Sequence, residues 1–199
     1  MISDILGSME YLELREMRQR HKLTAAQVAF ASGTALTNVC AYERGEKTPS
    51  TVTLERLVLA IKAGADSPVY RHTLLTVPAA ARELRKAVKS GASIASQVRI
   101  ARELVANSEF IFSDADKGAF FAPPSTTGDR RWDVLLAGVA EQLASRMNVP
   151  IPQWAPDKKL PSFWYVSNIA GMNDYLFAHS PTEMKTRGVL VDPADLVPV

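Results

Sequence analysis

The chain has 199 residues, which is enough for one domain of ordinary size and a smaller one. Its hydrophobic content of 47% and charged content of 22% are near globular averages, so disorder is not the default expectation. The net charge is +2, and the single cysteine, Cys40, excludes an internal disulfide. We therefore expect a soluble protein of the reducing cytoplasm, and since no apolar run is long enough, we expect no membrane span.

Four helices are predicted in the first 66 residues. They cover residues 8–21, 25–32 and 35–42 and a segment that starts at Ser50 or Thr51. Thr24 is placed to cap the second helix, because a threonine hydroxyl can accept a hydrogen bond from a free backbone amide of the first turn. Gly33 follows this helix, where a left-handed turn is needed. The spacing therefore predicts two short helices joined by a tight turn.

The middle of the chain alternates helical and irregular patterns. A linker with an extended piece is expected over 69–77, and Pro78 is suited to the first turn of a helix that reaches residue 89. A further helix is predicted over 93–107. Residues 110–124 hold four phenylalanines and a proline pair, and they are interpreted as an irregular connection.

The last third opens with the strongest amphipathic pattern of the chain. Residues 129–147 place large apolar side chains on one stripe and predict a long helix. Four prolines then exclude a long regular element over 148–163. Short helices are expected within 163–177 and 181–187, and a short strand or extended tail over 189–191. The predicted division is 1–66, a helical middle region 67–128, and a helical C-terminal region 129–199.

The segment from Leu14 to Ser50 resembles the Xre family, the helix-turn-helix regulators of the lambda and 434 repressor type. The matching positions run without a gap and are Leu14-Arg15, Arg18, Leu23-Thr24, Val28-Ala29, Gly33, Val39, Glu43-Arg44-Gly45 and Pro49-Ser50. The resemblance covers about a quarter of the chain. It implies a mainly α fold, with an N-terminal four- to five-helix lambda-repressor-like helix-turn-helix domain followed by a mostly helical C-terminal region.

The same resemblance implies roles for particular residues. Arg18 and Glu43 stand where the family forms a partly buried structural ion pair. The third helix of the family enters the major groove of double-stranded DNA. The positions that would contact DNA here are Thr24, Leu36, Thr37, Asn38, Ala41, Arg44 and Lys47. Two alternatives involve no DNA contact. Arg18 and Glu43 could form a surface ion pair that adds little stability, and the expected contact residues could form a solvated surface that binds only protein.

Two observations predict modest sequence specificity. Residues 1–66 hold eight basic and eight acidic side chains, a net charge of zero, whereas DNA-binding modules usually carry a positive footprint. Ala25 stands where the family often has a glutamine that binds a phosphate, and few residues suited to bidentate base contacts are present. We therefore expect DNA shape and dimerisation to contribute to recognition.

The C-terminal third carries a second resemblance. Thr127 to Asp133, Ala140 to Ala144 and Ser180 to Asp192 are similar to the C-terminal part of actinobacterial Xre-type regulators encoded beside nucleotidyltransferase-fold toxins of the AbiE type. This resemblance implies an antitoxin that represses its own operon and binds a nucleotidyltransferase-like toxin through its C-terminal region. A homodimer is expected from the helix-turn-helix, because a dimer would place two copies of the third helix about one DNA turn apart on a palindromic operator.

The leading hypothesis is thus a non-enzymatic, DNA-binding transcriptional repressor, the antitoxin of a toxin-antitoxin pair. Two alternatives remain open. One is a solitary or phage-type regulator whose C-terminal half senses a ligand, and the other is an adaptor or toxin inhibitor that does not bind DNA. We expect no catalytic residues, no metal and no cofactor, because His21, His72 and His179 are far apart and no catalytic motif is present.

Overall fold

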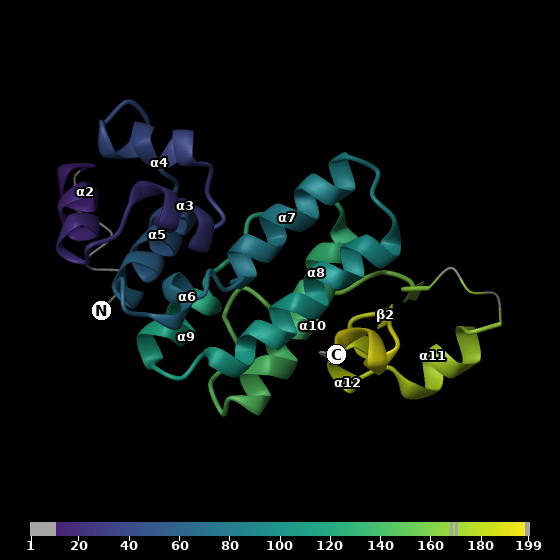
Figure 1. Cartoon of the computed structure of the whole chain (residues 1–199). Helices are drawn as coiled ribbons and strands as arrows, with labels where there is room; N and C mark the ends of the chain where they lie inside the picture. Colours follow the sequence, from purple (N-terminus) through teal and green to yellow (C-terminus); the bar gives the residue numbers. More distant parts are fainter. Residues whose placement is uncertain (1–10, 168, 170, 198–199) are drawn as a thin grey trace. The chain divides into compact units, whose positions relative to one another are not determined.

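The structure is a computed structural model, and it describes residues 11–167, 169 and 171–197. The chain is mainly α-helical, as predicted (Figure 1). It divides into two compact units. Unit 1 comprises Met1–Ala79 and Phe110–Ser125, and unit 2 comprises Ala80–Glu109 and Thr126–Val199. The residues expected to form a separate middle region, 67–128, are therefore shared between the two units.

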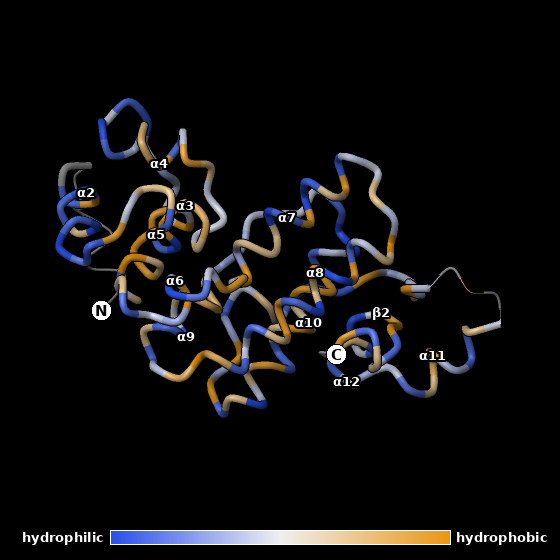
Figure 2. Tube along the Cα trace, viewed as in Figure 1, coloured by the Kyte–Doolittle hydropathy of each residue, from blue (hydrophilic) through white to orange (hydrophobic). Residues whose placement is uncertain are grey.

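The described part of unit 1 begins with four helices close to their predicted bounds. They are α2 (Tyr11–Arg20), α3 (Ala25–Ala31), α4 (Leu36–Glu43) and α5 (Thr51–Ala63). The predicted start of the first helix, residues 8–10, lies outside the described residues. Figure 2 shows α2 and the loop after α4 mostly hydrophilic along the backbone trace. Ser50 caps α5 by accepting a hydrogen bond from the Thr53 amide.

The core of unit 1 forms where the apolar faces of these helices meet. Leu14 of α2, Val28 of α3, Val39 of α4 and Ile61 of α5 are all almost completely buried. Helices α3 and α4 are in contact, and Val28 and Val39 are both buried at 1% exposure. This burial fixes which faces of α3 and α4 remain for a partner.

Two expectations for unit 1 were wrong. The predicted extended piece over 69–77 begins with a short helix, α6 (Pro68–Arg71), capped by Ser67. The predicted irregular connection over 110–124 contains a helix, α9 (Asp114–Phe120), which packs against α5. Buried Asp116 of α9 connects this helix to the start of α6, since it accepts hydrogen bonds from the hydroxyls of Ser67, the cap of α6, and Ser113, the cap of α9. Such partners lie too far apart in sequence for local patterns to indicate them.

Unit 2 is built around a central long helix. Its helices are α7 (Val77–Lys89, whose first three residues belong to unit 1), α8 (Ile94–Asn107), α10 (Arg130–Arg146), α11 (Asn173–His179) and α12 (Thr182–Lys185). Short 3-10 helices cover Ser108–Phe110 (η1, whose last residue belongs to unit 1) and Pro193–Leu196 (η2). Figure 1 shows α8 and α10 side by side, and the two helices are in contact.

Helix α10 carries the core of unit 2. Its apolar side chains are buried along the whole helix, and Trp132 is among the largest fully buried residues. The ring of Trp164 meets that of Trp132 edge-on at 5.0 Å between centroids. Gly138 lets α12 approach closely, because a Cβ there would collide with the sulfur of Met184. The amphipathic pattern predicted for 129–147 is therefore confirmed as a core helix.

A small parallel sheet closes the C-terminal part of unit 2. Strand β1 (Trp164–Tyr165) pairs with β2 (Val189–Leu190) in the register Trp164 to Val189. Next to β2, buried Arg187 donates hydrogen bonds to Glu141 of α10 at 2.5 and 3.0 Å and to the carbonyls of Ala155 and Lys158. This arginine therefore connects the proline-rich segment with α10.

Among the described residues, no helix is both long and apolar enough to cross a membrane.

Candidate nucleic-acid interface

The turn between α3 and α4 is fixed by local hydrogen bonds. Thr24 and Gln27 form a reciprocal capping box at the start of α3, so both free amides receive an acceptor. Gly33 has a φ of +61°, and a Cβ at this position would collide with the carbonyl of Pro78. Only glycine avoids both the left-handed strain and this collision. The sequence therefore sets the angle at which α4 leaves α3.

An ion pair joins α2 to the end of α4. The Arg18 Nε and Nη2 atoms donate to the two Glu43 oxygens, each at 2.7 Å, and Nη1 donates to the Leu23 carbonyl at 2.8 Å. The side chains are 13% and 8% exposed. The hydrogen bonds that Arg18 donates to the Glu43 carboxylate raise the pKa of the Arg18 guanidinium. This contact is the pair that the resemblance implies, and its bidentate geometry holds α4 in place.

The start of α4 presents side chains to solvent. Leu36, the first residue of the helix, is 44% exposed. Thr37 is also exposed, and Asn38 is half-buried. Ala41, one turn later, is 5% exposed and belongs to the core. We define the α4 surface as Leu36, Thr37 and Asn38, and Ala41 is left out of it.

The cations beside the α4 surface already have partners within unit 1. Arg44 donates to the two oxygens of Glu46 at 2.6 and 2.8 Å, and both residues are exposed. This contact lowers the pKa of the Glu46 carboxyl, so Glu46 stays ionised and neutralises Arg44. Lys47 donates to the Asn38 side-chain oxygen at 3.3 Å. The structure thus brings Asn38, Arg44 and Lys47 into one region, with one carboxylate among them.

Thr24, the last of the expected contact residues, precedes α3, and further cations lie on α2 and in the turn after it. Thr24 is exposed, but its hydroxyl is engaged with Gln27. Arg15 and Lys22 are exposed, and Arg20 lies 3.9 Å from Glu16 in a weak surface pair. Lys22 has a φ of +55° and forms the turn before α3. These cations are available to a polyanion but are not organised by hydrogen bonds as Arg18 is.

A buried cation that sequence reasoning missed lies on α5. Arg56 is 5% exposed and donates to the Ser125 hydroxyl at 2.5 Å, 69 residues away. Within the described part of the chain no carboxylate pairs with it, and its Nε atom has no hydrogen-bond acceptor. Burial lowers the pKa of this guanidinium. No sequence signal distinguishes Arg56 from a surface arginine, because its position between Thr53 and Leu57 is typical of an exposed helical residue.

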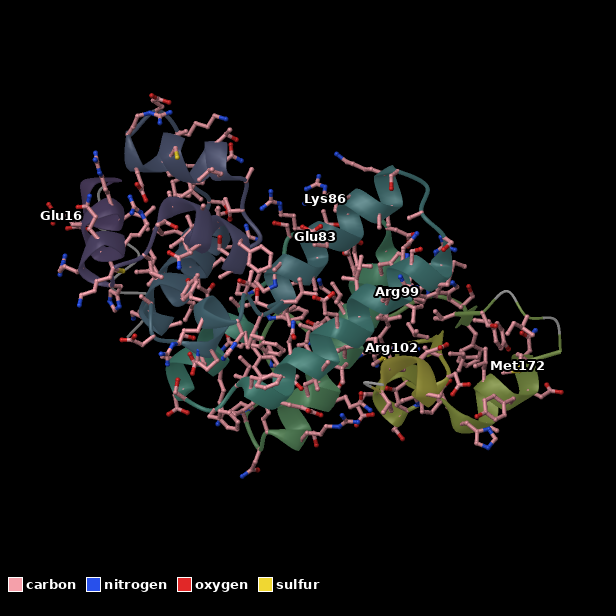
Figure 3. The ribbon with its side chains drawn as sticks, viewed as in Figure 1. Glu16, Glu83, Lys86, Arg99, Arg102 and Met172 are labelled. Carbon is pink, nitrogen blue, oxygen red and sulfur yellow. The ribbon has the colours of Figure 1, made fainter. Side chains whose placement is uncertain are left out.

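Unit 2 has two surface features that bear on partners. On α7, Lys86 pairs with Glu83 at 2.7 Å, and Figure 3 shows both residues on this helix. Around α11, Phe163 and Phe177 are 52% and 48% exposed, and their rings meet edge-on at 5.6 Å. The Lys185 ammonium lies 5.3 Å from the centre of the Phe177 ring. Paired aromatic rings left in solvent are typical of protein-binding surfaces.

Comparison of the chain with protein-family models, curated proteins and solved structures finds no match.

Proposed function

We propose that the chain is a non-enzymatic transcriptional regulator of the cytoplasm that binds double-stranded DNA through the α4 surface. The observation that carries this proposal is the exposed Leu36 and Thr37 at the first turn of α4. That turn follows a glycine turn after α3, and an ion pair holds the far end of the helix. A recognition helix that reads the major groove needs these features, because its N-terminal residues must reach base edges.

The side chains of the α4 surface suit base edges of different kinds. Leu36 can contact a thymine methyl group, and Thr37 can donate or accept a hydrogen bond. The side-chain oxygen of Asn38 accepts from Lys47, so its amide nitrogen remains able to donate. Two polar side chains, Thr37 and Asn38, and one apolar side chain, Leu36, support modest sequence specificity at each half-site.

The proposal is tested by fluorescence anisotropy with the full chain and the DNA upstream of its own coding region. We expect tighter binding to that DNA than to a scrambled fragment of equal length, with affinity that falls as salt rises. Asn38→Ala should reduce the preference about tenfold, since one good base contact discriminates by about 1–3 kcal/mol. Gln19→Ala, a change on exposed α2, is the matched control. Absence of binding at low salt would overturn the proposal.

The proposal extends to a homodimer on a palindromic site. Two copies of α4 should then contact half-sites about 34 Å apart, one turn of DNA. A fragment that carries a single half-site should bind much more weakly than the full site. Equal affinities for the two fragments would show that one chain suffices.

A second function, binding of a protein partner, is favoured by the exposed pair Phe163 and Phe177. We propose that unit 2 uses this pair to bind a nucleotidyltransferase-like toxin, which would make the chain an antitoxin. Phe177→Ser should abolish copurification with the product of a neighbouring toxin gene. Phe112→Ser in unit 1, where the phenylalanine is 73% exposed, should leave copurification unchanged. If both variants retain the partner, the interface lies elsewhere.

The two alternative functions correspond to two measurable cases. A solitary regulator that senses a ligand would bind DNA and have no protein partner, whereas an adaptor would bind the partner and no DNA. The anisotropy and copurification experiments separate these cases, because each measures one of the two activities.

A further inference from the structure

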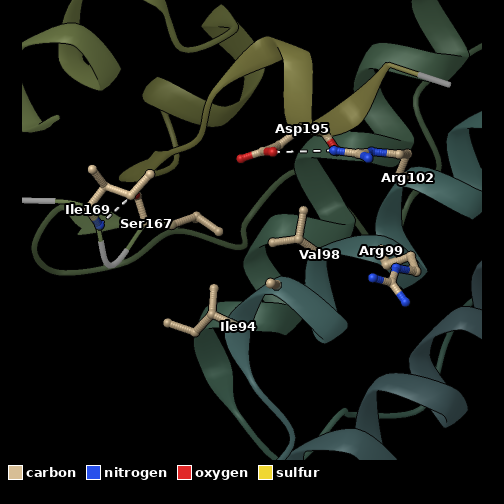
Figure 4. Close-up of a pocket in the computed structure, with 9 residues that line it drawn as sticks. Ile94, Val98, Arg99, Arg102, Ser167, Ile169 and Asp195 are labelled. Atoms are coloured by element: carbon tan, nitrogen blue, oxygen red, sulfur yellow. Dashed lines mark hydrogen bonds and ion pairs between the residues drawn. The ribbon is translucent and has the colours of Figure 1, made fainter. Parts of the chain in front are cut away.

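Unit 2 contains a cavity of about 380 Å³ along one side of α8. Its lining residues are Ile94, Ala95, Val98, Arg99, Arg102, Val166, Ser167, Ile169 and Asp195. They come from α8, from the segment after β1, and from η2 (Figure 4). The volume lies in the range of small-ligand sites, toward its lower end. All of these residues belong to unit 2, so the cavity is complete within one unit.

The cavity has an apolar part and a cationic part. Ile94, Val98 and Val166 form the apolar part. Arg99 and Arg102 lie three residues apart on α8, where side chains share one face of a helix. With a rise of about 1.5 Å per residue, Ile94 and Arg102 are about 12 Å apart along the axis. A ligand that matches both parts must therefore be elongated and carry its charge at one end.

The two arginines differ in the hydrogen bonds and ion pairs that they form. Arg102 Nε donates to the Asp195 carbonyl at 2.9 Å and Nη2 donates to the Asp195 carboxylate at 3.3 Å, as Figure 4 shows. No described residue accepts a hydrogen bond from Arg102 Nη1, and none forms an ion pair with Arg99. In the cavity, Arg99 therefore has no carboxylate partner, and Arg102 keeps its Nη1 atom available to donate a hydrogen bond to a ligand.

The contact between Arg102 and Asp195 is weak enough to be exchanged. At 3.3 Å it is longer than an ordinary charge-assisted hydrogen bond, and the two side chains are 32% and 42% exposed. Burial and the neighbouring Asp192 raise the pKa of the Asp195 carboxyl. A second carboxylate that reaches Arg102 would compete with Asp195 for the guanidinium.

From this geometry we propose that the cavity of unit 2 binds a small organic acid, a monocarboxylate with an apolar chain. The ligand carboxylate pairs with Arg99 and with Arg102 Nη1, and its chain lies over Ile94, Val98 and Val166. The binding is a property of unit 2 alone and does not depend on DNA binding by unit 1.

The proposal is tested by isothermal titration calorimetry of the full chain with butyrate, hexanoate, octanoate and the neutral hexanamide. We expect saturable binding of the acids, with affinity that rises about fourfold per methylene until the cavity is full. Hexanamide should bind at least about tenfold more weakly than hexanoate, because it lacks the charge. Equal affinity for the amide and the acid, or no binding of any acid, would overturn the proposal.

Two variants are expected to change the affinity for hexanoate in opposite directions. Arg99→Gln should weaken hexanoate binding about tenfold or more, whereas Asp195→Asn should strengthen it, because it removes the competing carboxylate and leaves the carbonyl contact. Arg85→Gln, an exposed arginine on α7, is the matched control and should bind as the wild type does.

A steric variant covers the case in which a charge change disturbs folding. Ala95 is exposed and lines the cavity, so Ala95→Trp should block the cavity and abolish binding without altering the core. If Ala95→Trp and Arg99→Gln both bind hexanoate as the wild type does, the acid binds elsewhere and the proposal is wrong.

Discussion

Arg18 and Glu43 carry the clearest energetic prediction at the scale of single residues. The pair is largely buried and bidentate, so removal of one partner leaves an unpaired charge. We predict that Arg18→Met lowers the free energy of unfolding by about 3 kcal/mol, measured by urea denaturation at neutral pH.

Two further variants control this measurement. Arg20→Met removes an exposed partner that lies 3.9 Å from Glu16 and should cost less than about 0.5 kcal/mol. The double variant Arg18→Met/Glu43→Leu should regain much of the loss, because no charge is then left buried alone. If Arg18→Met costs no more than Arg20→Met, the pair is a surface contact without structural weight.

Glu46 is predicted to weaken DNA binding, because its carboxylate pairs with the Arg44 guanidinium that would otherwise contact a DNA phosphate. Glu46→Gln should release the guanidinium, raise DNA affinity up to about fivefold at low salt and steepen the salt dependence by about one ion. Arg44→Gln should have the opposite effect on both quantities. Anisotropy titrations over a salt series measure both, and equal salt slopes for all three proteins would contradict this role.

The pH dependence of the same contact has a definite sign. Because Arg44 lowers the pKa of Glu46, the carboxylate stays charged until the pH falls below the ordinary range for glutamate. The DNA affinity of the wild type should therefore rise only in acid, where Glu46 takes up a proton and releases the Arg44 guanidinium. The Glu46→Gln variant should show no such gain.

At the scale of elements, the glycine turn before α4 allows a matched comparison. Gly33 and Gly91 have φ values of +61° and +67°, but a Cβ would meet the Pro78 carbonyl at Gly33 and nothing within 4 Å at Gly91. Gly91→Ala should therefore cost about 1 kcal/mol for the left-handed backbone, and Gly33→Ala clearly more. Thermal unfolding of the two variants tests this order, and equal melting temperatures would contradict it.

The cap of α10 gives a pH-dependent prediction. Asp129 accepts from the Arg131 amide at 2.9 Å, and the hydrogen bonds from the Arg131 side chain lower the pKa of the Asp129 carboxyl. Its stabilising effect is thus complete above the ordinary pKa of aspartate and is lost as the pH falls through the lowered value. Asp129→Ala should cost about 1 kcal/mol at neutral pH and less in acid.

Asn at the same position separates the cap from the charge. Asp129→Asn keeps an oxygen that can accept from the Arg131 amide, so it should lose less stability than the alanine variant and show a weaker dependence on pH. Urea unfolding at neutral and acidic pH measures both effects. A loss for Asp129→Ala that does not change with pH would contradict the contribution of the charge.

The sequence indicated those elements whose signals are local. Thr24, Gly33 and Ser50 marked the ends of α3 and the start of α5, and apolar spacing marked α10. Helix α9 was missed because its seven residues are too few to show a period, and its position depends on the contact of Asp116 with Ser67. Local patterns cannot reveal such contacts, since they join residues that are distant in the chain.

The same limit applies to the candidate sites. The exposure of Leu36 and Thr37 follows from helix spacing once Val39 is placed in the core. The pairing of Arg44 with Glu46 and the contacts of Arg102 with Asp195 do not follow from spacing, because each depends on how a loop or the η2 segment returns to a helix. The cavity of unit 2 could therefore not be predicted from the sequence.

At the scale of the whole molecule, unit 1 is discontinuous in sequence. Helix α9 packs on α5, and the Ser125 hydroxyl accepts a hydrogen bond from buried Arg56. A fragment of residues 1–79 lacks both contacts, so we predict that it unfolds at a clearly lower temperature than residues 1–125, which retain them. Circular dichroism measures the two transitions. Equal transitions would mean that α9 adds nothing to the stability of unit 1.

The proposal that the α4 surface contacts DNA is tested most sharply by site-directed cleavage of the bound DNA. Cys40 is the single cysteine of the chain, so a Cys40→Ser background can carry one new cysteine as the labelling site. An iron chelate is attached at Thr37→Cys or at Arg71→Cys in this background. Both labelled proteins must still bind the upstream DNA. Arg71 belongs to α6, which is separated from α4 in Figure 1. We predict cuts clustered within the protected site for the α4 label and none for the α6 label. The same cutting pattern from both labels, or none from the α4 label, would contradict it.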